Sequence, residues 1–104
     1  MLPSYRVIVF ADVRSKEDEQ SRFVDIQLEG KLPFVPLGKM DICAKNKNGK
    51  EAALSVTEVN WVVVKDSGYF EVHASQAQYG LISAQAIIAA FKHHGWKGKI
   101  VRRT

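Results

Sequence analysis

Cysteine is nearly absent from this chain, which has only Cys43 among its 104 residues. A lone thiol excludes an intramolecular disulfide and a metal cage built from several cysteines. We expect Cys43 to behave as a small apolar residue of the core. The sequence also lacks a glycine-rich phosphate loop, a G-x-G-x-x-G fingerprint, an H-E-x-x-H motif and a C-x-x-C pair. No catalytic residue, metal ligand or cofactor is therefore predicted, although a site assembled from distant residues is not excluded.

Long apolar runs are missing as well. No stretch approaches the ~18 uncharged apolar residues of a membrane span, and the N-terminal residues lack the apolar core of a secretory signal. We therefore expect a cytoplasmic protein without a membrane partner. An apolar content of 46% and a charged content of 25% are ordinary for a globular protein, so residues 1–104 are predicted to form a single domain.

Acidic residues are absent after Glu71, and the last thirteen residues carry a net charge of +5. Residues 1–91, with 10 basic and 11 acidic side chains, sum to −1. A basic surface at one end of a protein attracts anionic partners such as nucleic acid. The predicted anion-binding residues are Lys92, Lys97, Lys99, Arg102 and Arg103. Trp96 either stacks on an unpaired base or packs against Phe91, in which case the charges are only solvated surface.

Strand patterns recur along the chain. Apolar residues on both faces of Tyr5–Val13 indicate a central strand, and strict alternation in Phe23–Glu29 indicates a strand with one face in water. Asn48-Gly49, a strong hairpin signal flanked by three lysines, separates the next two strands. The predicted strands are Tyr5–Val13, Phe23–Glu29, Met40–Lys45, Ala52–Val64, a partner strand from Tyr69 and a final edge strand Lys99–Arg103.

The apolar face changes within the strand that ends at Val64, which predicts a bulge or sharp bend near Thr57 and Glu58. Lys65 to Gly68 has the composition of a four-residue turn. This turn would pair Val64 with Tyr69 and place Trp61 opposite Val72.

The segment from Gln76 to His94 is predicted to form one long helix, although Gly80 leaves room for the helix proper to start only at Ser83. Gly95 suits the left-handed position after the helix, and Trp96 can then touch Phe91, as in a Schellman termination. The helix is apolar on more than one side. Either a bent sheet wraps it within one chain, or part of its apolar surface meets a second copy. We expect a homodimer, formed through this helix or through a sheet edge.

The predicted fold is therefore α+β: a mainly antiparallel, strongly bent sheet of five or six strands, with the long helix on its concave face and a short last strand. An alternative function is a small-ligand pocket or enzyme site. It would lie between the sheet, the helix and the proline-rich segment Gly30–Lys39, which contains Pro33 and Pro36. Its predicted lining is Phe34, Trp61, Phe70 and His73. A metal held jointly by His93 and His94 is disfavoured, because neighbouring helical residues point about 100° apart.

Three segments, Leu32–Met40, Val56–Trp61 and Tyr69–His73, carry a resemblance to known proteins. In these segments the chain resembles small uncharacterised bacterial proteins carried on mobile gene cassettes. The resemblance implies a compact β-rich fold with a proline-rich cover. It implies no catalytic or binding residue.

Overall fold

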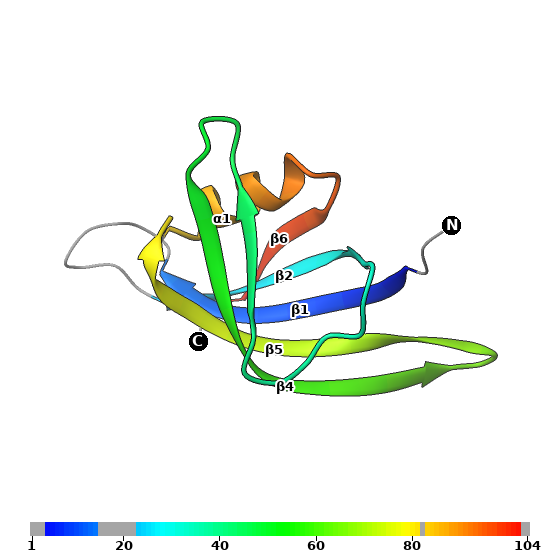
Figure 1. Ribbon diagram of the computed structural model, residues 1–104. Helices are drawn as coiled ribbons and strands as arrows, with labels where there is room; N and C mark the ends of the chain where they lie inside the picture. The colour runs from blue at the N-terminus through cyan, green and yellow to red at the C-terminus, as the bar shows by residue number, and fades with distance from the viewer. Residues whose placement is uncertain (1–3, 15–22, 82, 103–104) are drawn as a thin grey trace.

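The computed structural model describes residues 4–14, 23–81 and 83–102 of the chain (Figure 1). Within these ranges it contains six strands and one helix. They are β1 (Tyr5–Arg14), β2 (Phe23–Leu32), β3 (Asp41–Lys45), β4 (Glu51–Val64), β5 (Ser67–Gly80), α1 (Ala84–Lys92) and β6 (Lys97–Arg102). The mixed α+β class is confirmed.

The strands form one curled sheet in the order β3-β4-β5-β1-β2-β6. As Figure 1 shows, the sheet bends like half of a barrel, and α1 lies inside the curl. The last strand, β6, lies at an edge of the sheet beside β2, as its charged alternation predicted. No helix of the described ranges is long and apolar enough to cross a membrane.

The expectation of a mainly antiparallel sheet requires a correction, because the sheet is mixed. β1 and β5 pair in parallel at its centre, with Val7 opposite Phe70 and Ala11 opposite Ala74. The long excursion through β2, β3 and β4 allows β5 to return to β1 in the same direction, which a tight turn cannot do.

The prediction of one long helix from Gln76 to His94 is wrong, whereas the alternative start at Ser83 is confirmed. Residues 76–80 continue β5, and the N–H of Leu81 still donates to the carbonyl of Glu51 at 2.8 Å. The helix begins only after Ser83, whose hydroxyl accepts the N–H of Ala86 at 3.2 Å. Residues 76–80 have a composition that suits a helix, but they continue the strand that pairs with β4. The helix therefore has only nine residues.

The predicted helix termination is confirmed, although α1 ends at Lys92 rather than at His94. Gly95 has a φ of 86°, and the N–H of Trp96 donates to the carbonyl of Phe91 at 3.2 Å. The Trp96 and Phe91 rings also meet edge to face, with centroids 5.2 Å apart. This termination turns the chain directly into β6 and fixes the position of Trp96.

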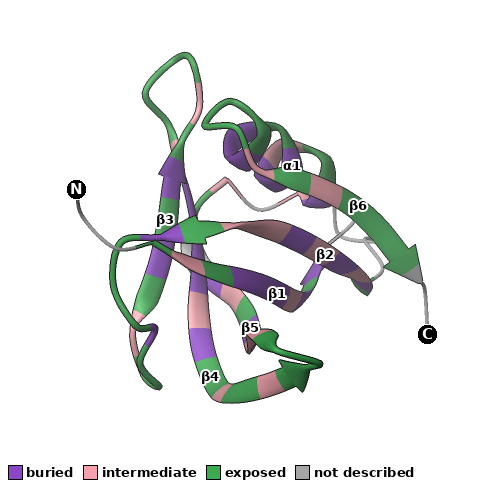
Figure 2. Ribbon diagram, turned by 90° about the vertical axis from the view of Figure 1, so that its right-hand side faces the viewer, coloured by how far each residue is buried: buried purple, intermediate pink, exposed green. Residues whose placement is uncertain are grey.

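The apolar face of α1 is buried by the chain's own sheet (Figure 2). Ile87, Ala90 and Phe91 are at most 2% exposed and belong to one core with Val9 and Leu28. The helix is therefore wrapped within one chain, and its apolar face does not serve as a dimer surface. Any dimer must use another part of the molecule.

The bulge predicted near Thr57 and Glu58 is confirmed, since the β4–β5 register shifts between Val56 and Glu58. The predicted turn is too long, because Val64 pairs with Ser67 across a two-residue turn. The register therefore differs by two residues. Since side chains alternate with a period of two, every residue keeps its predicted face.

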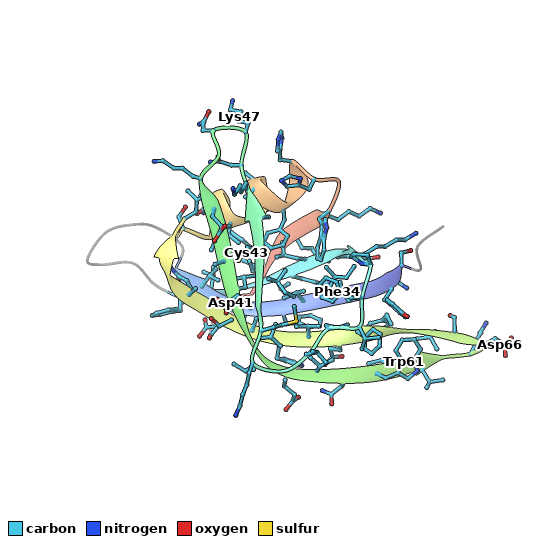
Figure 3. All side chains as sticks on the ribbon, viewed as in Figure 1. Phe34, Asp41, Cys43, Lys47, Trp61 and Asp66 are labelled. Carbon is cyan, nitrogen blue, oxygen red and sulfur yellow. The ribbon has the colours of Figure 1, made fainter. Side chains whose placement is uncertain are left out.

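Cys43 is not a core residue, contrary to the expectation. It is exposed on β3, while its neighbours Ile42 and Ala44 are buried. The alternation of β3 buries the even-numbered residues, so an odd-numbered cysteine faces outward (Figure 3).

Candidate anion-binding site

Three adjoining grooves lie where the ends of β1, β2 and β6 meet the turn after α1. The central groove has a volume of about 440 Å³ and shares Lys31, His94 and Trp96 with a second groove of about 280 Å³ on the β3 side. It shares Glu29 and Lys97 with a third groove of about 170 Å³ along β6. The shared residues show that the three grooves adjoin one another around the end of β2.

Five cationic side chains line these grooves, and we call them the basic strip: Arg6, Lys31, Lys45, Lys97 and Lys99. All five residues are exposed. Arg6 pairs with Glu29, with 3.0 Å between Nη2 and Oε2. Within the described ranges the four lysines form no ion pair. The strip therefore carries uncompensated positive charge, which an anion can neutralise.

Register explains why residues distant in sequence meet here. Arg6 lies opposite Lys31 in the β1–β2 pair, and Lys97 lies opposite Glu29 in the β2–β6 pair. Residues opposite one another in a sheet point to the same face. The pairing thus gathers cations from three strands on the convex face.

Trp96 lies between the central groove and the β3-side groove. Its indole covers Gly30 so closely that a Cβ added there would lie 2.0 Å from Cδ2. Phe91 contacts the indole from the core side. Trp96 is half-buried and lines both grooves, so it can offer an aromatic surface to a ligand.

His94 connects the helix end to the β3–β4 hairpin. Its Nε2 donates to the carbonyl of Lys45, with 2.6 Å between the two atoms. This hydrogen bond brings the lysines of the hairpin, including Lys47 at its tip (Figure 3), to the same side as the turn after α1. Of the three hairpin lysines, Lys45 lines the β3-side groove, whereas Lys47 and Lys50 line none of the three grooves.

Charge is unevenly distributed over the convex face. Asp12 lies opposite Asp25, six residues and so about 20 Å along β1 from the pair formed by Arg6 and Lys31. Burial raises the pKa of the Asp12 carboxyl, and the neighbouring Asp25 carboxylate raises it further. Among the described side chains of this face, the positive charge therefore lies at the end that carries the strip.

The structure brings together only part of the predicted anion-binding set. Lys97 and Lys99 line the same groove. Lys92 is exposed in the last turn of α1 but lines none of the three grooves. Arg102 belongs to β6, but its side chain lies outside the described part of the chain, as does the whole of Arg103.

Neither Arg6 nor Lys31 was among the predicted anion-binding residues, and Lys45 belonged to a separate cluster, the three lysines that flank Asn48-Gly49. Arg6 and Lys31 lie in the part of the chain whose net charge is −1, so composition gave no signal. Only the knowledge that β2 lies between β1 and β6 would have grouped them with Lys97.

The alternative pocket of Phe34, Trp61, Phe70 and His73 is only partly assembled. The Trp61 and Phe70 rings are in contact, with centroids 4.8 Å apart. His73 points to the opposite face of β5, because three positions separate it from Phe70. There His73 stacks on Phe10 and binds Glu71, with 2.8 Å between Nε2 and Oε1. Trp61 is 54% exposed and Phe34 44%, so these aromatic residues form a surface, not an enclosed pocket.

No cluster of three or more His, Cys, Asp or Glu side chains suited to a metal occurs among the described residues. His93 and His94 contact each other edge to face, with centroids 5.1 Å apart.

No protein-family model, no curated protein and no solved structure matches this chain.

The contact between Trp96 and Gly30 makes a testable prediction. Gly30→Ala places a methyl group within the indole, so we expect Trp96 to move into solvent and the free energy of unfolding to fall by about 1–3 kcal/mol. In a Trp61→Phe background, Trp96 is the one remaining tryptophan, and its emission maximum should shift to longer wavelength. Gly38→Ala is the matched control, since a Cβ there meets nothing within 4 Å. An unchanged emission spectrum for Gly30→Ala would contradict the described packing.

Proposed function

We propose that this protein is a non-enzymatic binding protein whose basic strip holds an anionic polymer, with single-stranded nucleic acid as the partner class. The observation that carries the proposal is that three adjoining grooves are lined by five cations and one paired carboxylate. Cations distributed along adjoining grooves suit successive phosphates better than they suit one small anion.

Trp96 favours a single-stranded partner over a duplex. A half-buried indole between two grooves can stack on an unpaired base, whereas the bases of a duplex are already stacked on one another. The lysines contact phosphates without distinguishing bases, so we expect little sequence preference.

Salt dependence tests this function. Four unpaired lysines that displace counterions from a single strand give a slope of about −2.8 in a plot of log K against log salt concentration. Affinity for a fluorescein-labelled single-stranded oligonucleotide should therefore fall about 50-fold between 50 and 200 mM salt. Fluorescence anisotropy measures the affinity. Quenching of Trp96 in the Trp61→Phe variant reports whether bases stack on it.

Two outcomes would contradict the proposal. The first is absence of binding at 50 mM salt, and the second is an affinity that does not change with salt. Tighter binding to a duplex of the same length would agree with binding at the basic strip. It would contradict the stacking of bases on Trp96.

The broader sequence expectations stay predictions at this point. They are a cytoplasmic location, membership among proteins of mobile gene cassettes, and assembly into a homodimer. The burial of α1 limits the homodimer to a sheet edge, and one edge has the features required.

A further inference from the structure

The β4–β5 hairpin extends beyond the rest of the sheet as an arm, formed by residues 57–69 (Figure 1). β3 pairs with β4 only up to Ser55, and Lys39 and Met40 exchange backbone hydrogen bonds with Val56. From Thr57 to Val64 no described residue pairs with the outer edge of β4. The arm thus presents a free strand edge.

Backbone groups at this edge point away from β5 at alternate residues. Val64 and Ser67 flank a two-residue turn and so form a hydrogen-bonded pair. By alternation, the N–H and C=O groups of Val59, Trp61 and Val63 face outward. Such a row of unsatisfied groups is a template for another β-strand.

The side chains distinguish this edge from the other two free edges of the sheet. β6 presents Lys97 and Lys99, and β3 alternates through Asp41 and Lys45; such charges oppose strand addition. The arm edge is mostly apolar, with Trp61 54% exposed and Val63 69% exposed. It is the least protected edge in the described part of the molecule.

We propose that the arm edge of β4 pairs with the same edge of a second copy of this chain, in an antiparallel two-fold arrangement centred on Trp61. In this register Val59 lies opposite Val63 of the second copy, and Asn60 lies opposite Val62. No charged residue lies opposite a like charge, because Glu58 meets Val64. The edge is thus complementary to itself, and a two-fold contact closes as a dimer without propagating.

Exposed apolar side chains supply part of the area that a dimer requires. Six such side chains lie on the arm and on the proline-rich segment: Phe34, Val35, Leu37, Trp61, Val63 and Val64. The two aromatic side chains are of the kind that buries ~150–250 Å² when fully covered, and the four aliphatic side chains add to them. A stable interface buries about 800 Å² per partner, to which the paired strand backbones also contribute.

A chain of neighbouring residues links the start of the proline-rich segment to the arm. Tyr5 lies opposite Leu32, where the proline-rich segment begins, and its ring contacts Phe70 with centroids 5.9 Å apart. Phe70 in turn contacts Trp61. Figure 3 shows Phe34 and Trp61 on the same side of the molecule. The inference does not depend on the anion-binding proposal, because the arm and the basic strip share no residue.

Analytical ultracentrifugation of the full chain tests the dimer. Between about 10 and 200 μM, where a micromolar equilibrium shifts its populations, the average mass of the wild type should rise toward twice the chain mass of 11.7 kDa. The double variant Trp61→Lys with Val63→Lys should sediment as a monomer. Val101→Lys, at a residue that is 47% exposed on β6, is the matched control and should stay dimeric.

Amide hydrogen exchange in the wild type tests the pairing mode and needs no variant. The N–H groups of Trp61 and Val63 should be protected about as well as those of Asn60 and Val62, which bond to β5 within the chain. A wild type that is monomeric at 200 μM would overturn the proposal. So would a double variant as dimeric as the wild type, or a dimer in which Trp61 and Val63 exchange rapidly.

Discussion

Reversing two charges of the basic strip together, Lys31→Glu and Lys97→Glu, is expected to weaken binding of a single-stranded oligonucleotide by about 100-fold at low salt. Lys31 lines the central and β3-side grooves, and Lys97 lines the central and β6 grooves. Each reversal therefore removes a phosphate contact and adds a repelling charge where two grooves join. The magnitude of the salt slope should fall by about 1.5.

This double variant should fold as stably as the wild type, because neither lysine is buried or forms an ion pair with a described residue. The control is Lys39→Glu with Lys65→Glu, which changes the net charge equally at exposed lysines outside the three grooves. Anisotropy titrations compare the two double variants. Equal losses of affinity would mean that overall charge, not the strip, holds the anion.

Phe91→Ala is expected to have the largest effect on folding. Phe91 is 2% exposed, is among the largest fully buried side chains, and also supports the Trp96 ring. Removing such a side chain leaves a cavity and lowers the free energy of unfolding by about 3–5 kcal/mol. Since small domains are stable by only about 5–15 kcal/mol, this is a large part of the total.

Urea denaturation followed by circular dichroism measures the effect of Phe91→Ala. The transition midpoint should fall while the slope with urea stays the same. Phe34→Ala removes the same atoms from a side chain that is 44% exposed, and should cost less than about 1 kcal/mol. Similar losses for both variants would contradict the assignment of Phe91 to the core.

Local patterns in the sequence were sufficient for most of the strands. Apolar and polar residues alternate in β2 and β3 because one face of each strand is buried. In β4 the apolar residues change from one face to the other, and this change located the bulge at Thr57. Gly95 marked the helix end, because few other residues adopt its positive φ. In each case the signal lies within a few residues of the feature that it predicts.

Other features were decided by partners distant in sequence. Residues 76–80 form a strand because β4 lies beside them, although their composition also suits a helix. Cys43 is exposed because β3 turns its odd-numbered residues away from the core. The residue type of Cys43 does not reveal which face of the strand it occupies. Such choices depend on tertiary contacts that override local propensity.

By itself, the sequence determined the β-rich α+β class, the bulge in β4 and the termination of α1, because periodicity and backbone freedom act over short distances. Only the tertiary structure decided that β1 pairs in parallel with β5 and that β2 lies between β1 and β6. This strand order gathers Arg6, Lys31 and Lys97 into one strip and leaves the β4 edge unpaired. The physical reason is that strand order is set by burial of the common core, which a single segment does not encode.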